Sequence, residues 1–240
     1  MRKLLPFVLA TIGLLSTGAR PLAVPTLDPV GQKVTNIRDK FVAAVRACGV
    51  VPKFEPAVRI ATEPAVIAYR GKSRTLVIGR WETLPPPIKG FFNQWAAHDM
   101  PGKGGDELFD ALFNGFLVGH ELGHWVGDQS GRLDTIDSYE AEIEANQFAI
   151  AFAALDPATA KSLERTVGQF SFLRTLPNPV PVGQDERAYF NTHYWTMPTE
   201  DPVAYNWYQG RLMQEAWARR GKADFCQLVK SSPERSAVTK

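Results

Sequence analysis

A His-Glu-x-x-His motif sets the narrowest limits on how this chain can fold. Its residues are His120, Glu121 and His124. Two histidines four residues apart on a helix lie about 6 Å apart along its axis and ~40° apart around it, so both imidazoles can reach one metal ion. Glu121 comes next around the helix, close enough to hold a metal-bound water but badly placed to be a third ligand beside both histidines. The motif therefore predicts a helix with a two-histidine metal clamp and Glu121 as a general base.

A second motif follows, in which the pattern Glu-x-x-Ala-Asn runs from Glu142 to Asn146. Together the two motifs resemble those of the gluzincin metallopeptidases, and the chain is most similar to bacterial metallopeptidases of this type. The resemblance covers residues 108–152. It implies a zinc ion bound by His120, His124 and Glu142. It also implies that the Asn146 side chain accepts a hydrogen bond from a ligand imidazole and thereby sets the orientation of that ring.

The helix that carries Glu142 can also be placed from its own residues. Asp137 and Glu140 form a capping-box pattern, which predicts a helix from residue 138 to about residue 155. Glu140 would be occupied at the cap, and Glu144 lies about 200° from Glu142 around the helix, so it would point away from the metal. Glu142 shares a face with Asn146. Helix geometry and the resemblance therefore agree on Glu142 among the three glutamates.

The resemblance implies peptide-bond hydrolysis, with a peptide or protein as the substrate. Zinc would lower the pKa of a bound water towards ~7 and polarise the scissile carbonyl, while Glu121 takes the water proton and passes it to the leaving amine. The oxyanion that develops needs a further donor. Residues 185–194 hold the other cluster of His, Tyr and Arg, in which we rank His193 first, then Tyr194 and Tyr189. The alternative is a surface or core-edge aromatic cluster with no catalytic role.

Two other classes of function are compatible with the same residues. In a non-catalytic, exported structural or interaction protein, zinc on His120, His124 and Glu142 would only tie two helices together, and its fourth coordination position would be closed. An interaction domain with a vestigial motif is the third possibility. The intact Glu121 argues against it, because a motif without catalytic use could lose this residue at no structural cost.

The N-terminus has the pattern of a secretory signal. Arg2 and Lys3 precede an apolar run over residues 4–15, and small residues follow at 16–19. We expect residues 1–23 to be signal and leader and residues 24–240 to form one domain, with a mature N-terminus between residues 19 and 26. The protein would be secreted or periplasmic, without a stable membrane span once the signal is removed. The alternative is an uncleaved N-terminal membrane anchor.

The net charge limits the classes of partner that the protein could bind, and the two cysteines are considered together with the expected export. The formal net charge of +2 falls to 0 when Arg2 and Lys3 leave with the signal, since 2 − 2 = 0. No cluster of lysine and arginine interleaved with aromatics remains, so nucleic acid and acidic membranes are weak candidates. Cys48 and Cys226 would meet an oxidising compartment and form a disulfide between the first and last helices. Alternatively, both are small buried apolar residues.

The predicted fold class is α+β, predominantly helical and zincin-like, with a small, mostly antiparallel sheet before the metal helix. Helices are expected over residues 37–48, 88–97, 106–126, 138–155, 157–174, 202–220 and 223–230, after a loose leader over residues 21–32. Strands are expected over residues 57–61, 65–69 and 75–78, with a hairpin turn at residues 70–73. The sheet could pair with an extended peptide at an edge strand, could cover the apolar back of the metal helix, or could do both.

Four glycines, Gly115, Gly119, Gly123 and Gly127, recur every fourth residue along the predicted metal helix. Each glycine inside a helix costs roughly 1 kcal/mol relative to alanine, so the stripe requires a reason. We expect another backbone to approach closely along this face, either that of the Glu142 helix or that of the sheet.

Overall fold

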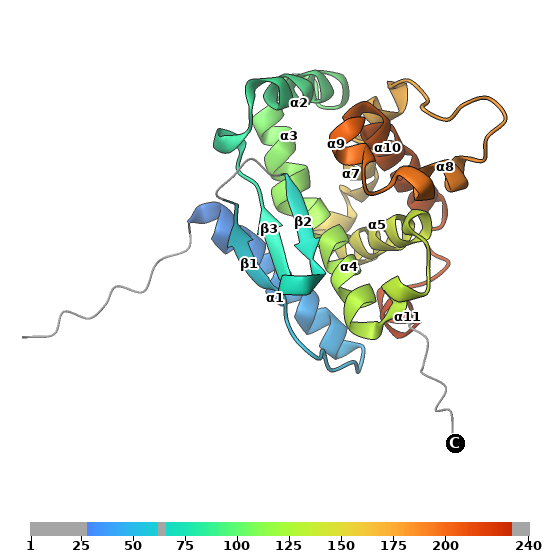
Figure 1. The fold of residues 1–240 in the computed structure, drawn as a ribbon. Helices are drawn as coiled ribbons and strands as arrows, with labels where there is room; N and C mark the ends of the chain where they lie inside the picture. The colour runs from blue at the N-terminus through green and yellow to red at the C-terminus, as the bar shows by residue number, and fades with distance from the viewer. Residues whose placement is uncertain (1–27, 62–65, 232–240) are drawn as a thin grey trace, which may run out of the picture.

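Helices α4 (Leu117–Ser130) and α5 (Ser138–Leu155) pack against each other at the centre of the structure (Figure 1). This computed structural model describes residues 28–61 and 66–231, so the expected signal and most of the leader lie outside the described residues. The described part is mostly helical with one small sheet, which confirms the α+β class. No helix in this part is long and apolar enough to cross a bilayer.

The sheet is mixed rather than mostly antiparallel as predicted. Its strands are β1 (Ala57–Ile60), β2 (Ile67–Arg70) and β3 (Thr75–Ile78), in the order β1-β3-β2. β2 and β3 form the expected antiparallel hairpin through the 3₁₀ turn η1 (Gly71–Ser73), but β3 lies parallel to β1. β3 takes the central position because it is the most apolar strand, with its last three residues buried. β2 is left as an edge strand beside α4.

Several helix boundaries differ from the predicted ones. Helix α1 (Pro29–Ala47) begins before Asn36, because the Asp28 side chain accepts hydrogen bonds from the backbone N–H groups of Val30 and Gly31. The predicted leader therefore ends before residue 29. The helix expected over residues 157–174 is divided into α6 (Pro157–Ala160), α7 (Leu163–Gly168) and the 3₁₀ turn η5 (Phe172–Thr175).

The predicted metal helix is also interrupted. α3 (Gly105–Ala111) leads into a π-helical turn, η3 (Leu112–Phe116), before α4 begins. Asp106 is not the cap; instead the Glu107 carboxylate accepts a hydrogen bond from the Gly104 N–H at 3.0 Å. A π-helical turn rotates the residues after it relative to those before it. The apolar positions of α3 and the imidazoles of α4 consequently do not lie on one regular helix.

The remaining helices surround this centre. They are α2 (Pro86–Asp99), α8 (Glu186–His193), α9 (Met197–Glu200), α10 (Pro202–Ala218) and α11 (Phe225–Lys230), with 3₁₀ turns η2 (Trp81–Thr83) and η4 (Arg132–Asp134). Asp137 caps α5 and Asp201 caps α10 as predicted, each through its carboxylate, but the Glu140 carboxylate binds Arg219 and does not complete the predicted capping box. α10 lies along α5, which brings residues some 60 positions after the second motif next to it (Figure 1).

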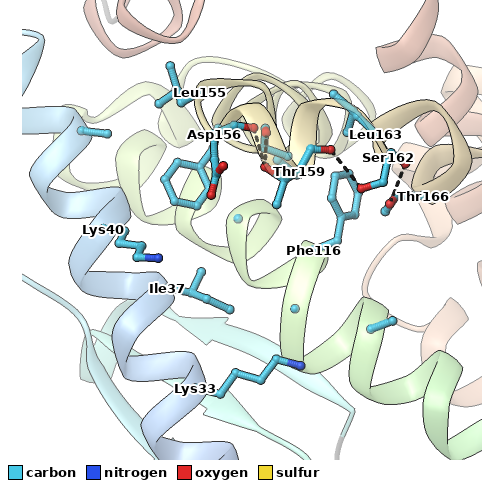
Figure 2. Close-up of a pocket in the computed structure, with 17 residues that line it drawn as sticks. Lys33, Ile37, Lys40, Phe116, Leu155, Asp156, Thr159, Ser162, Leu163 and Thr166 are labelled. Atoms are coloured by element: carbon cyan, nitrogen blue, oxygen red, sulfur yellow. Dashed lines mark hydrogen bonds between the residues drawn. The ribbon is translucent and has the colours of Figure 1, made fainter.

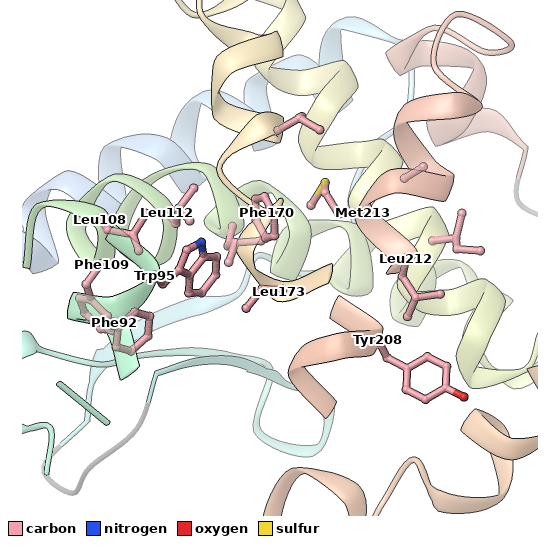
Figure 3. Packing of buried hydrophobic residues seen from close by; sticks show 14 of the residues in the cluster. Phe92, Trp95, Leu108, Phe109, Leu112, Phe170, Leu173, Tyr208, Leu212 and Met213 are labelled. Atoms are coloured by element: carbon pink, nitrogen blue, oxygen red, sulfur yellow. The ribbon is translucent and has the colours of Figure 1, made fainter. Parts of the chain in front are cut away.

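Two hydrophobic clusters flank the central helix pair. One joins α2, α3, α5 and α10 through buried aromatic and aliphatic side chains, among them Trp95, Phe109 and Tyr208 (Figure 3). The other lies among α1, β3, α4 and α11 and includes Phe41 and Trp125. The sheet therefore covers an apolar face of α4, as one of the predicted roles requires. Cys48 and Cys226 form the predicted disulfide, which joins the C-terminal end of α1 to α11.

Candidate metal centre

Two glycines allow α4 and α5 to approach closely enough to form a site between them. A Cβ atom on Gly123 would lie 2.9 Å from Ala145 Cα, and one on Gly119 would lie 3.2 Å from Ala149 Cα. Both distances are shorter than ordinary van der Waals contact, so a side chain at either position would separate the helices. The predicted reason for the glycine stripe is confirmed for these two positions. Gly127 instead meets the Leu133 side chain, and Gly115 meets the Asp110 carbonyl within the preceding turn.

The close helix pair brings together the three predicted metal ligands. The Nε2 atoms of His120 and His124 lie 3.1 Å apart, and Glu142 Oε2 and Oε1 lie 3.4 Å and 3.5 Å from them respectively. Donor atoms held about 2.0–2.1 Å from one tetrahedral ion are roughly 3.3 Å apart. His120 and Glu142 are buried, whereas His124 is partly exposed. The spacing and the mixed nitrogen and oxygen donor set therefore permit a metal ion at this point.

Asn146 orients the first histidine. Its Oδ1 lies 2.8 Å from His120 Nδ1, and both side chains are buried. If the ring carries its proton on Nδ1, that N–H donates to the amide oxygen and the lone pair on Nε2 points towards the ligand cluster. The hydrogen bond predicted for Asn146 is thus present in the geometry. Once His120 loses its second proton, this hydrogen bond favours the tautomer that a metal ligand needs.

Tyr194, which follows the last residue of α8, and Gln209 on α10 hold Glu142. The Tyr194 hydroxyl donates to Glu142 Oε1 at 2.7 Å, and Gln209 Nε2 donates to Oε2 at 3.4 Å. The charge of Glu142, together with burial, raises the pKa of Tyr194 above its ordinary value, so the hydroxyl stays protonated as a donor. Tyr194 therefore contacts a candidate ligand directly, which makes it a support for Glu142.

The first-ranked oxyanion candidate, His193, has a different environment. Its Nδ1 lies 2.8 Å from the backbone carbonyl of Tyr189, and the two rings lie 4.3 Å apart between centroids. Within residues 28–61 and 66–231, no hydrogen bond joins His193 or Tyr189 to the three candidate ligands. Of the three candidates from residues 185–194, the fold connects only Tyr194 to the metal ligands.

Glu121 lies beside the ligand cluster without belonging to it. Its Oε2 accepts a hydrogen bond from the backbone N–H of Tyr69 on β2 at 2.6 Å. The Tyr69 hydroxyl in turn donates to Asp128 Oδ2 at 2.6 Å, seven residues further along α4. The edge strand is therefore attached to α4 at two points. The other two glutamates of α5 face elsewhere, since Glu140 binds Arg219 and Glu144 binds Arg132.

His120 and Glu142 form a buried pair in which each residue stabilises the charged form of the other. Burial lowers the pKa of His120, but the hydrogen bond and the charge of Glu142 outweigh it and raise this pKa to about 9. Burial opposes ionisation of Glu142, yet its hydrogen bonds with His120 and His124 hold its pKa well below the ordinary value. Both shifts favour a protonated His120 beside an ionised Glu142.

Three residues near the site lie outside both motifs and are not predicted by them. Tyr69 contributes through its backbone, which carries no sequence information, and Gln209 and Tyr205 lie four residues apart on one face of α10. Burial and the charges of Glu142 and Glu121 raise the pKa of Tyr205 well above its ordinary value, so its hydroxyl stays protonated. Tyr205 and Gln209 could have been indicated only as polar residues four positions apart on the predicted helix over residues 202–220.

Comparison of the chain with family models, curated proteins and solved structures found no match. The gluzincin resemblance therefore depends on the two motifs alone, and membership of that family stays a prediction.

Proposed function

We propose that this protein is a zinc-dependent peptidase in which His120, His124 and Glu142 bind the metal and Glu121 is the general base. The observation that carries the proposal is the position of Glu121. Its carboxylate lies next to the donor cluster on α4, yet it is bound to an edge strand instead of joining the cluster. A glutamate that served only to bind metal would be placed among the donors. One that accepts a proton from an attacking water needs the adjacent position.

Zinc is favoured over other ions by the donors themselves. Two imidazole nitrogens and one carboxylate form a donor set typical of catalytic zinc sites, whereas calcium and magnesium prefer oxygen ligands. When bound, zinc would supply Lewis-acid polarisation of the scissile carbonyl and a lowered pKa for the attacking water. The residues of the chain supply the rest: Asn146 orients His120, Tyr194 and Gln209 hold Glu142, and Glu121 accepts and returns the proton.

The edge strand β2 supports a peptide as the substrate. The Val66 carbonyl accepts a hydrogen bond from the Gly79 N–H. The backbone N–H and C=O groups of Val66, Ala68 and Arg70 therefore point towards β3, and those of Ile67 and Tyr69 point away from it. The hydrogen bond from the Tyr69 N–H to Glu121 agrees with this pattern, because it lies on the side of β2 away from β3. The backbone groups of Ile67 and the Tyr69 carbonyl then lie along the outer edge. An extended peptide paired there would lie beside the general base.

Tyr205 is the hydroxyl that we assign to the developing oxyanion in this reaction. Tyr194 is less suited, because its proton is already donated to Glu142. Burial and the charges of Glu142 and Glu121 keep the Tyr205 hydroxyl protonated, and among the described residues it forms no hydrogen bond. A donor without a fixed partner can turn towards an oxyanion without breaking an existing bond.

The deciding experiment pairs metal analysis with a broad peptide-library cleavage assay on the wild type and Glu121→Gln. We expect stoichiometric zinc and a nearly unchanged melting temperature in both. Hydrolysis should fall by at least the factor of about 10²–10⁴ that general-base catalysis contributes. Activity that survives Glu121→Gln would overturn the mechanism, and zinc in both proteins without cleavage by either would favour a structural zinc.

The metal ligands are tested on the same protein. Glu142→Ala should lose the metal and some stability, because the site ties α4 to α5. Glu140→Ala is the matched control, since Glu140 lies on the same helix but binds Arg219. Equal zinc content in these two variants would contradict the assignment of Glu142.

A further inference from the structure

A cavity lies apart from the metal centre. It has a volume of about 550 Å³, is open to solvent on one side, and is lined by α1, the junction of η3 and α4, the end of α5, and α6 with α7 (Figure 2). None of the metal ligands nor Glu121 lines it. Gly119, the residue of α4 that lines it, is turned about 100° from His120 and about 140° from His124 around the helix at 100° per residue. Ligand sites in proteins typically have volumes of about 300–1,000 Å³.

Small residues create this cavity, and apolar side chains form most of its surface. Gly115 and Gly119 leave room on the α4 side, and Ala44 on α1 leaves room opposite. Phe116, Ile37 and Leu163 project towards the space in Figure 2. An aliphatic group placed here would exchange water for hydrocarbon contacts on several sides.

The hydroxyl groups on the α6 and α7 side do not make the surface of the cavity polar. Thr159 donates to the backbone carbonyl of Ala153, Ser162 to that of Thr159, and Thr166 to that of Ser162. Their protons are thus used within the helices. The part of a ligand that lies against α6 and α7 is therefore expected to be hydrocarbon.

Charge is distributed unevenly around the cavity. Lys33 and Lys40 lie seven residues apart on the same face of α1, and Asp156 lies on the opposite wall. The Lys33 ammonium is already bound to the Asp110 carboxylate at 2.8 Å and to the Asp110 carbonyl at 3.0 Å. Lys40 is exposed and has no hydrogen-bond or ion-pair partner within residues 28–61 and 66–231. An anionic group is consequently attracted to the α1 wall near Lys40 and repelled from Asp156.

We propose that this cavity binds a single-chain fatty acid, with its carboxylate at Lys40 and its hydrocarbon chain along Phe116 and Leu163. The apolar surface selects an aliphatic chain, and the position of Lys40 opposite Asp156 selects an anionic head group and fixes its direction. Neither the three candidate metal ligands nor Glu121 lines the cavity, so fatty-acid binding can be tested separately from the proposed peptidase activity.

The first test fills the cavity. Binding of the fluorescent fatty acid cis-parinaric acid to the whole protein is measured by exciting the probe directly. We expect saturable binding to the wild type and a loss of at least tenfold in affinity for Ala44→Phe, because the new ring occupies the space. Ala43→Phe is the matched control, as Ala43 is the neighbouring residue on α1 but is exposed and does not line the cavity. Absent or non-saturable binding to the wild type would overturn the proposal, as would equal binding by the two variants.

The second test changes charge at the surface, where folding is not at risk. Lys40→Glu should weaken binding of cis-parinaric acid several-fold but leave binding of its methyl ester unchanged, because the ester has no carboxylate. Lys72→Glu alters the net charge equally on the remote turn η1 and should behave as the wild type. Melting curves verify that all variants are folded. If Lys40→Glu and Lys72→Glu bind the fatty acid equally, the carboxylate does not lie at Lys40 and the proposal fails.

Discussion

At the scale of single residues, a proton on His120 competes with the metal. The pKa of His120 in the metal-free protein is raised to about 9, so below this pH the ring is protonated and must lose a proton before Nε2 can bind an ion. Affinity for zinc should therefore increase as the pH rises towards about 9 and level off above it. Competition with a chromogenic chelator across this range measures it. Affinity that is already level at pH 7 would show that Glu142 does not hold the proton in place.

Asn146 should set metal affinity through the same ring. Asn146→Ala removes the acceptor for His120 Nδ1 and should weaken zinc binding by about 10–100-fold, the usual effect of losing such a partner. Asn146→Asp restores an acceptor and adds a negative charge, so its affinity should equal or exceed that of the wild type. Isothermal titration with zinc compares the three proteins. An unchanged affinity in Asn146→Ala would contradict the role assigned to this side chain.

At the scale of elements, the metal centre depends on how closely α4 and α5 approach. A Cβ on Gly123 would lie 2.9 Å from a backbone atom of Ala145, so Gly123→Ala must separate the helices. We expect a loss of about 1–3 kcal/mol in the free energy of unfolding, together with weaker zinc binding. Gly90→Ala is the control, because nothing lies within 4 Å of a Cβ there, and it should stabilise by about 0.4–1 kcal/mol. Urea unfolding and zinc titration measure both; a Gly123→Ala protein as stable as the control would refute the close approach.

At the scale of the whole molecule, the disulfide closes most of the described chain into one loop. Cys48 and Cys226 are separated by 178 positions, and all candidate site residues lie between them. Replacing both with alanine should lower the free energy of unfolding by about 2–5 kcal/mol, largely because the unfolded chain gains freedom. Zinc content should not change, since neither α1 nor α11 supplies a ligand. Denaturant unfolding with and without reductant checks this, and a wild type insensitive to reductant would indicate free thiols.

The residues that could be located in advance are those that depend on near neighbours in the chain. The spacing of His120 and His124 defines a clamp as soon as the segment is helical, and the Asp137 cap aligns Glu142 with Asn146 on one face of α5. Hydrogen bonds and side-chain pairs within one or two helical turns determine such features. The glycine stripe likewise indicated a close neighbour, although only two of its four members contact α5.

The sequence by itself thus indicated the clamp and its third donor, because both can be recognised from residue types and local spacing, whereas it left the pairing of Cys48 with Cys226, 178 positions apart, open. The tertiary structure alone decided the mixed strand order, the π-helical turn before α4, and which residues from α8, α10 and β2 surround the donors. These features follow from packing between segments far apart in the chain. Tyr194, Gln209 and the Tyr69 backbone reach the site only because α10 packs along α5 and β2 lies beside α4, and no local pattern contains that information.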